Sequence, residues 1–434
     1  GRIALYYDTS SFTGTAEAKG GCGSYDSWTL TCAENGTVGS FDRTNNDLRV
    51  DTSWRFQKND SPFNFNHISV TDGARVTMEH DVSITAADIS LDTASSLFLS
   101  PNDVVRIPRI TVHDRSAVTL SGEETIIADT LSVTGGGAVT VVPERVLFLT
   151  IPHITVSADS TISANEKGYG YNSGPGAPVT AETYAGASYG GLGYRNVPES
   201  LYGLSTAPVD FGSGGLGHHP HGGGAIRLVA TSTLVNDGVI SADGGNTSSG
   251  GSVYVTAGAM SGSGVFRAKG GSSYCPNVCF GPGGGGRVAL YYATSTFTGD
   301  ALASGWTGYG GASMAGTVVI SEMITTEPAG ASNIFFIPGI EASRLYMQDG
   351  LVENRLWEPN WYTDVEKLYL NESGESVQTG IYTRDVIDAA FGFNIYKNFM
   401  TSLDTLVADG TITAWQAYPY DWRRSIDDIV QFGT

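Results

Sequence analysis

Residues 67–164 repeat one short pattern five times. The copies are HISVTDGARVTM (67–78), DISLDTASSLFL (88–99), RITVHDRSAVTL (109–120), TLSVTGGGAVTV (130–141) and HITVSADSTISA (153–164). Their first residues lie 21, 21, 21 and 23 positions apart. Within each copy apolar and polar residues alternate, which is typical of strands that bury one face. This stretch therefore predicts a β fold built from short strands at a fixed period.

The apolar residues of the repeats fall into columns. Three columns lie within the quoted copies, and a fourth lies five residues before each later copy of the first. The columns are Ile68, Ile89, Ile110, Leu131 and Ile154; Val70, Leu91, Val112, Val133 and Val156; Val76, Leu97, Val118, Val139 and Ile162; and Ile84, Val105, Ile126 and Leu149. These columns predict about three short strands per repeat, with turns made of Asp, Ser, Thr and Gly.

A period near 21 is also compatible with a leucine-rich repeat, but the LxxLxLxxN frame of that repeat is missing. A parallel β-helix fits better. One coil of such a helix cannot bury its own apolar column, whereas stacked coils about 4.8 Å apart bury a continuous one. We therefore predict a right-handed parallel β-helix with coils of about 21 residues.

The pattern breaks at 165–222 into Gly, Tyr, Ser and Pro, which indicates either a long surface insertion or a glycine-stacked segment. It resumes in a more Gly-rich form at 222–245, 250–271 and 284–299. Glycine clusters allow tight corners with positive φ. Residues 1–322 resemble the repetitive β-helix regions of very large bacterial surface or adhesin-like proteins, which implies an extracellular or cell-surface location.

The first residues, GRIALYYDTSSFTG (1–14), are nearly repeated as GRVALYYATSTFTG (286–299). The opening therefore reads as a coil without its leading glycines. We expect that residue 1 is not the natural start of the protein.

Composition limits the partners. Asp and Glu number 44 against 24 Lys and Arg, a formal charge of −20. Nucleic acid and anionic membranes would repel such a surface, so we predict no nucleic-acid partner. No apolar run approaches the roughly 18 residues that a spanning helix needs.

The four cysteines form two close pairs, Cys22 with Cys32 and Cys275 with Cys279, both in Gly-rich loops. The even count and the spacing favour two local disulfides in an extracellular protein. Free thiols are the next interpretation. A zinc site is the least favoured, because neither CxxC nor a nearby CxxH occurs.

The repeat pattern is absent after residue 330. FIPGIEASRLY (336–346) is an apolar run that meets a Pro-Gly turn, LWEP (356–359) follows, and YPYDWRR (418–424) comes near the end. Between them, Ile395, Phe399, Leu403, Leu406 and Val407 share one helical face, with Gly410 as a helix stop. Residues 333–434 resemble the N-terminal part of α/β-hydrolases of the lecithin:cholesterol acyltransferase-like family.

The resemblance implies a role for the Pro-Gly turn. In that family the residue after the glycine supplies one backbone N–H of the oxyanion hole, and here that residue is Ile340. Such a donor stabilises the charge that develops on oxygen during acyl transfer. The alternative is that the turn only ends a strand. Asp421, Trp422 and Arg423 read as structural residues.

The catalytic triad is absent from residues 333–434. All seven His residues lie at or before position 221. The family places its nucleophile on a G-x-S-x-G elbow after the PYDWRR segment, and the chain stops at Thr434 just before that point. GASYG (186–190) matches the elbow around Ser188, but neither a strand before it nor a helix after it is expected. We therefore expect these 434 residues to lack hydrolase activity.

Two further clusters of polar residues are weaker candidates for a functional site. HHPH (218–221) could bind a metal but reads better as a turn-rich loop, so we predict no metal and no cofactor. Asp72, Asp92, Asp114 and Asp159 lie near one corner of the coils, where paired carboxylates could serve polysaccharide cleavage. They do not form one column, which favours solvated turn residues.

The sequence thus predicts a β-helix over 1–326 with the insertion at 165–222, a linker at 327–332 and an incomplete α/β-hydrolase domain over 333–434. The favoured function is a β-helical stalk that carries a lipase- or acyltransferase-like serine hydrolase acting on acyl esters of lipids. One alternative is a non-enzymatic surface protein with a degenerate hydrolase tail. Another is a β-helix that binds or cleaves a polysaccharide, with a cell-surface polymer as partner.

Overall fold

The computed structural model describes residues 1–12, 14, 16–26, 29–32, 36–178, 184–217, 220–275, 279–308, 311–323, 333–349, 352–359, 361–390, 393–408, 411–425 and 429. The chain divides into two compact units, Gly1–Met323 and Ile324–Thr434. It is mainly β, with several parallel sheets. No helix in the described part of the chain is long and apolar enough to cross a membrane.

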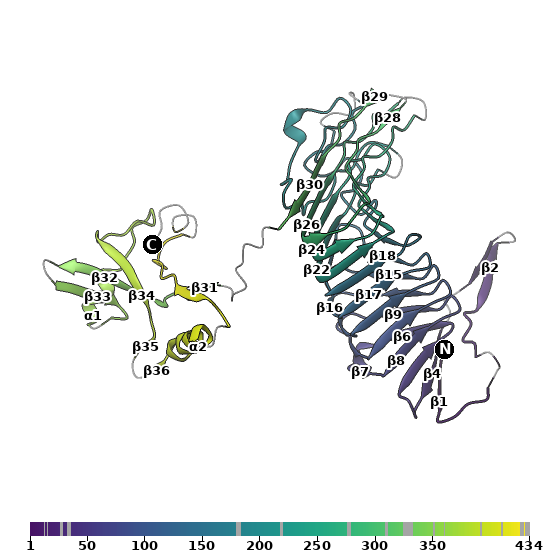
Figure 1. Ribbon diagram of the computed structural model, residues 1–434, viewed down its shortest axis with the longest axis horizontal. Helices are drawn as coiled ribbons and strands as arrows, with labels where there is room; N and C mark the ends of the chain where they lie inside the picture. Colours follow the sequence, from purple (N-terminus) through teal and green to yellow (C-terminus); the bar gives the residue numbers. More distant parts are fainter. Residues whose placement is uncertain are drawn as a thin grey trace. The chain divides into compact units, whose positions relative to one another are not determined.

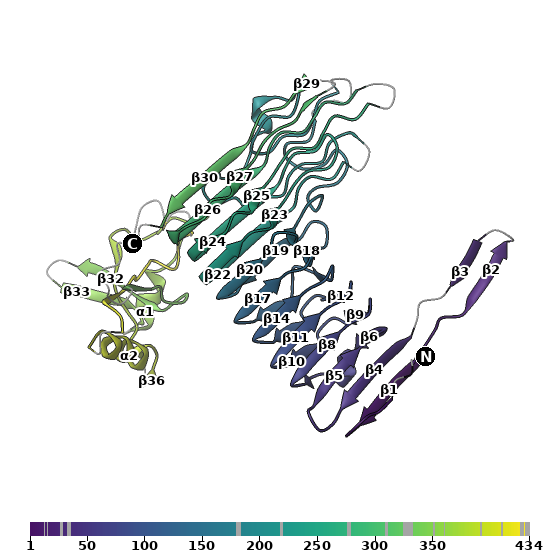
Figure 2. The same cartoon turned by 45° about the vertical axis from the view of Figure 1, so that its right-hand side comes forward.

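In the N-terminal unit each 21-residue repeat adds one strand to each of three parallel sheets (Figures 1 and 2). The first sheet contains β8 (His67–Val70), β11 (Asp88–Leu91), β14 (Arg109–Val112), β17 (Thr130–Val133) and β20 (His153–Val156). The second contains β6 (Ser53–Phe56), β9 (Arg75–Met78), β12 (Ser96–Phe98), β15 (Ala117–Leu120), β18 (Ala138–Val141) and β21 (Thr161–Ser163). The third contains β7 (Phe63–Asn64), β10 (Ser83–Thr85), β13 (Val104–Arg106) and β16 (Thr125–Ile127).

The three predicted columns within the quoted copies are confirmed by the strand register, and the fourth is confirmed from Ile84 through Val105 to Ile126 but does not continue to Leu149, which lies opposite Leu228. Ile89 lies opposite Ile68 and Ile110, and Val118 lies opposite Leu97 and Val139. The three columns taken from the quoted copies are buried in one continuous apolar core. Alternation therefore decides which face of each strand is inside, because a slip of one residue would turn the whole apolar set outward.

In the first four repeats the corner between the first and second strands uses two consecutive residues with positive φ. In successive repeats the pairs are Asp72 and Gly73, Thr93 and Ala94, Asp114 and Arg115, and Gly135 and Gly136. Corners also bond to one another: the Gly73 N–H donates to the Thr93 carbonyl at 2.8 Å, and the Ala94 N–H to the Asp114 carbonyl at 2.7 Å. Backbone bonds between corners thus support a conformation that non-glycine residues rarely adopt.

The third sheet ends at β16, and beyond residue 145 a single long strand pairs with two shorter strands of the preceding repeat. β22 (Ala225–Asn236) pairs with β19 (Val146–Thr150) through its first half and with β20 through its second half. β24 (Ser252–Ser261) and β26 (Arg287–Ser295) continue this long-strand form, and β23 (Val239–Ser241), β25 (Val265–Arg267) and β27 (Asp300–Leu302) continue the second sheet.

The Gly-rich residues of 165–222 stack against the Gly-rich residues of later repeats, which is the second of the two arrangements considered from the sequence. The Gly212 N–H donates to the Gly223 carbonyl, and the Gly223 N–H donates to Ser249. A Cβ on Gly222 would lie 1.8 Å from the Gly212 carbonyl oxygen. Backbones approach so closely here that a side chain at this position has no room.

The near-repeat of residues 1–14 at 286–299 is part of a repeated structural module. β1 (Arg2–Tyr7) pairs with β4 (Thr37–Asp42), and β26 pairs with β30 (Thr317–Glu322); Arg2 faces Thr37 as Arg287 faces Thr317. Each module also carries an antiparallel pair between its two long strands. These pairs are β2 (Cys22–Asp26) with β3 (Thr29–Cys32), and β28 (Thr307–Gly308) with β29 (Gly311–Ala312). β5 (Asp47–Val50) follows β4 by an antiparallel turn and pairs with β8.

The C-terminal unit is smaller, and its described residues include two α-helices, α1 and α2. β31 (Asn333–Phe336) pairs in parallel with β37 (Ala414–Ala417), and β32 (Ser343–Asp349) lies between β33 (Val352–Trp357) and β34 (Ile381–Val386) in an antiparallel sheet. The remaining elements are α1 (Tyr362–Glu366), β35 (Ala389–Ala390), β36 (Phe393–Asn394) and α2 (Lys397–Ala408). α2 contains Phe399, Leu403, Leu406 and Val407 of the predicted apolar face, but Ile395 lies before its first residue, and Leu403 is the buried member. Gly410, the predicted helix stop, lies outside the described residues.

Candidate functional site

The Pro-Gly turn follows β31 directly. The Ala342 N–H donates to the Gly339 carbonyl at 3.1 Å, which closes a four-residue turn with Glu341 at φ 65°. Ile340 occupies the second position and its side chain is 78% exposed. Among the described residues, no acceptor binds the Ile340 N–H. The amide that the resemblance singles out is therefore an open donor on the surface of this unit.

Two side chains hold the turn on either side of Ile340. The Gly339 N–H donates to the Tyr396 hydroxyl at 3.3 Å, and the Tyr396 ring packs edge-on against Phe336. On the other side, Trp357 Nε1 donates to the Glu341 carbonyl at 2.6 Å. Trp357 belongs to the LWEP segment, so two of the three motif segments meet at this turn.

The third segment, YPYDWRR, binds the next residue of the chain. Trp422 Nε1 donates to the Ser343 carbonyl at 3.1 Å, and the Tyr420 N–H donates to Ser343 Oγ at 3.0 Å. The rings of Trp357 and Trp422 pack edge to face with centroids 5.2 Å apart. The three segments that carry the resemblance thus lie together around residues 339–343, although up to 79 positions separate the bonded residues.

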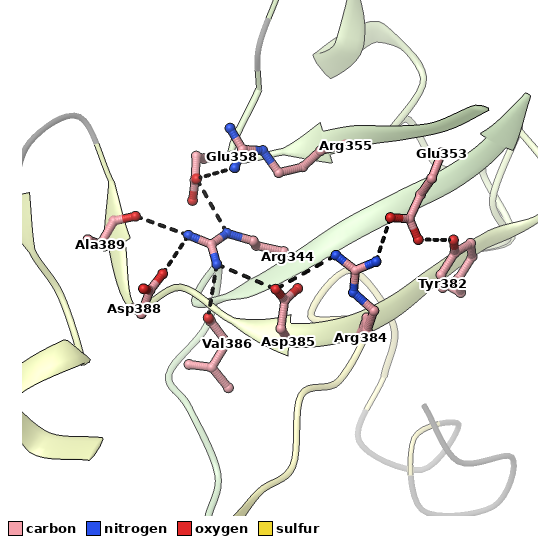
Figure 3. A network of polar contacts seen from close by, with 10 residues as sticks. All are labelled: Arg344, Glu353, Arg355, Glu358, Tyr382, Arg384, Asp385, Val386, Asp388 and Ala389. Carbon is pink, nitrogen blue, oxygen red and sulfur yellow. Dashed lines mark hydrogen bonds and ion pairs between the residues drawn. The ribbon is translucent and has the colours of Figure 1, made fainter. Parts of the chain in front are cut away.

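An ion-pair network is centred on Arg344, which follows the turn by two residues (Figure 3). The Arg344 guanidinium is 11% exposed and contacts Asp388 at 2.8 Å, Glu358 at 3.4 Å and Asp385 at 3.5 Å. Its hydrogen bond to Asp388 holds the pKa of that carboxyl below its ordinary value. Arg355 contacts the same Glu358 oxygen at 3.0 Å. Arg344 thereby joins β32, the LWEP segment and the residues after β34.

Asp421 and Arg423 have structural partners, as the sequence suggested for this segment. Arg423 pairs with Asp421 at 2.6 Å with both side chains buried, and it also donates to the Leu368 carbonyl and to Ser376 Oγ. This pair ties the last segment to the loop after α1. Buried charges of this kind are stable only when their remaining polar atoms have partners.

Sequence reasoning did not single out Arg344, Asp388 or Tyr396. Their roles depend on partners 42 to 57 residues away, and the acids and the tyrosine occur in no recognisable motif. The one local signal is Glu358, a carboxylate inside LWEP whose side chain is buried.

An acyl-transfer site also needs a nucleophile activated by a general base, and no such pair is found beside the turn among the described residues of 333–434. Residues 333–434 contain no His. Ser188, in the G-x-S-x-G match of the N-terminal unit, is fully buried, and its Oγ accepts the Gly193 N–H at 2.9 Å. A buried hydroxyl within packed glycine backbone is not accessible to an ester.

Cys275 and Cys279 form a disulfide with Cα atoms 4.0 Å apart. Cys22 is also disulfide-bonded, and Cys32 is its directly opposite partner in the β2–β3 ladder; the Cys32 side chain lies outside the described residues. Of the HHPH segment, His218 and His219 lie outside the described residues as well. Within the described ranges, no three His, Cys, Asp or Glu side chains cluster as metal ligands do.

Comparison with known proteins returned no matching family model, no matching curated protein and no matching solved structure.

Proposed function

We propose that the C-terminal unit is the N-terminal part of an α/β-hydrolase domain of the lecithin:cholesterol acyltransferase-like type, in which the Ile340 N–H is one oxyanion donor. The reaction is hydrolysis or transfer of a carboxylic ester of a lipid. The observation that carries the proposal is the assembly of the three motif segments around the turn: Trp357 binds the Glu341 carbonyl and Trp422 binds the Ser343 carbonyl.

The physical argument concerns preorganisation. A donor contributes most to acyl transfer when it is fixed before charge develops on the substrate oxygen. Bonds to Gly339, Glu341 and Ser343 fix the backbone on both sides of Ile340, while the Ile340 amide itself is left without a partner among the described residues. A turn that only ended a strand would not need two aromatic side chains bonded to its backbone and a third bonded to the residue that follows it.

The same proposal assigns residues 1–323 to a right-handed parallel β-helix that serves as an extracellular stalk. The shared register of successive repeats in three sheets supports this assignment. The nucleophile, acid and base would come from the longer polypeptide that contains this chain, since 333–434 has no His.

The test replaces one backbone donor. Ile340→Pro removes the N–H, and proline is favoured at the second position of such a turn, so the turn itself is preserved. In the chain extended through the downstream coding sequence, we expect turnover of short-chain nitrophenyl esters that a serine-directed phosphonate abolishes. Ile340→Pro should lower kcat about 100- to 1,000-fold, as loss of one oxyanion donor does.

The matched control is Ile340→Ala, which keeps the N–H and should leave kcat near the wild-type value. An Ile340→Pro variant with unchanged kcat would exclude the oxyanion role. Absence of any ester turnover by the well-folded extended protein would exclude the hydrolase itself and favour the non-enzymatic surface protein.

A further inference from the structure

A polar groove of about 520 Å³ lies on the N-terminal unit, beside Gly-rich residues of successive repeats and Trp306, the residue before β28. Glu166, Asp243, Arg267, Lys269 and Trp306 line it, and they come from four successive levels of the stack. Three steps of about 4.8 Å make the groove about 14 Å long. That length suits several linked units of a polymer better than one small molecule.

The wall of the groove is rigid. Arg267 donates to one Asp243 oxygen through Nε at 2.7 Å, and the Lys269 N–H donates to the other at 2.8 Å. The Asp243 N–H in turn donates to Asn165 Oδ1 at 2.7 Å. Asp243 is thus neutralised and fixed, and its ion pair also holds the Arg267 guanidinium in place.

Three groups in the groove are available to a ligand. Among the described residues, neither the Lys269 ammonium nor the Glu166 carboxylate has a hydrogen-bond or ion-pair partner. The Trp306 side chain is 45% exposed at the edge of the groove. An exposed indole beside donors and acceptors is the combination that a sugar ring needs, because the C–H face of the sugar packs on an aromatic ring and its hydroxyls bind the polar groups.

From this arrangement we propose that the groove binds a neutral polysaccharide, with Trp306 packing on a sugar ring and Lys269 and Glu166 binding its hydroxyls. The free cation and the free anion cancel, so the groove itself does not select a charged polymer. The chain as a whole carries a formal charge of −20, which disfavours an anionic one. The inference does not depend on the hydrolase proposal, since no residue of the C-terminal unit takes part.

The experiment uses the full 434-residue chain in native gels that contain soluble polysaccharides. The neutral panel is mannan, galactomannan, xyloglucan, a starch-type glucan and a β-1,3-glucan; polygalacturonate and alginate are the anionic comparison. Calorimetry with an oligosaccharide of the strongest ligand then measures Kd. We expect retardation by at least one neutral polymer.

Trp306→Ala should weaken that binding at least about tenfold, and Lys269→Met should also weaken it. The matched control is Phe148→Ala on β19, where an aromatic side chain is 58% exposed outside the groove, and its Kd should be unchanged. Equal thermal midpoints would show that the variants are folded. Should Trp306→Ala misfold, Lys269→Met alone decides. No retardation by any neutral polymer, binding only to the anionic ones, or neutral binding insensitive to both variants would overturn the proposal.

Discussion

Trp357 donates a hydrogen bond from its indole nitrogen to the Glu341 carbonyl at 2.6 Å, and this bond joins the LWEP segment to the Pro-Gly turn. The same indole packs against Trp422 from the YPYDWRR segment. One side chain therefore links all three stretches that resemble a hydrolase.

Trp357→Phe should loosen this turn while it keeps the aromatic packing. Loss of one hydrogen bond corresponds to about 1 kcal/mol, so the amide of Ala342 should exchange about fivefold faster. Hydrogen exchange followed by mass spectrometry of the 339–343 segment measures the change. Trp361→Phe, at a surface position, is the control and should leave that exchange rate as it is. Equal protection in both variants would mean that the bond does not hold the turn.

Val112→Asp should destabilise the N-terminal unit strongly. Val112 is fully buried between Leu91 and Val133, so the new carboxylate has neither water nor a partner. We expect the free energy of unfolding to fall by at least about 3 kcal/mol. Thr111→Asp, on the neighbouring outward position, should change it little. A urea midpoint that moved equally for both variants would contradict the assigned faces.

Asn236→Val should stabilise the same unit. Asn236 continues the valine column opposite Val156 and is fully buried. Its Oδ1 has no partner among the described residues, and its Nδ2 makes only a long bond of 3.4 Å to the Val265 carbonyl. Replacing a half-satisfied amide with an apolar side chain should raise the unfolding free energy by about 1 kcal/mol. Asn236→Asp should lower it, and a loss in both variants would show that the long bond matters more than the orphan oxygen.

Asp103 should make stability depend on pH. Burial raises the pKa of its carboxyl above the ordinary 3.8, although the Val82 and Ser100 N–H groups donate to it. The folded state then binds the proton more tightly than the unfolded chain. Its contribution to stability is full below the unfolded pKa and is lost as pH rises through the higher folded pKa.

The measurement compares the chain with Asp103→Asn in urea, from about pH 3 to about pH 7. The stability of the wild type relative to the variant should fall as pH rises across that window and then stay constant. Parallel curves would mean that Asp103 keeps its ordinary pKa in the folded state.

Both cysteine pairs should be found as disulfides by chemical analysis. Mass spectrometry of unreduced peptides should link Cys275 to Cys279 and Cys22 to Cys32 in material made in an oxidising compartment. The 275–279 bridge closes a ring with a sequence separation of 4 residues, so its removal should cost no more than about 2 kcal/mol. Thiol labelling of the denatured, unreduced chain at all four positions would refute both pairings.

The repeat, the buried columns and the register of residues 67–163 could be predicted from the order of the residues alone. These depend on a local rule: alternation chooses the inner face of a strand, and a fixed period brings equivalent residues opposite each other. Ile89 faces Ile68 and Ile110 because each lies 21 residues from the next.

The packing of the Gly-rich residues and the bonds that hold the C-terminal turn could not be predicted in this way and are seen in the folded structure. Glycine carries no side-chain pattern, so the stacking of Gly212, Gly223 and Ser249 is set by backbone bonds between distant segments. The bonds of Trp422 to Ser343 and of Arg344 to Asp388 likewise span 79 and 44 residues. Such contacts follow no sequence period, because they form only when several separate elements have already been brought together.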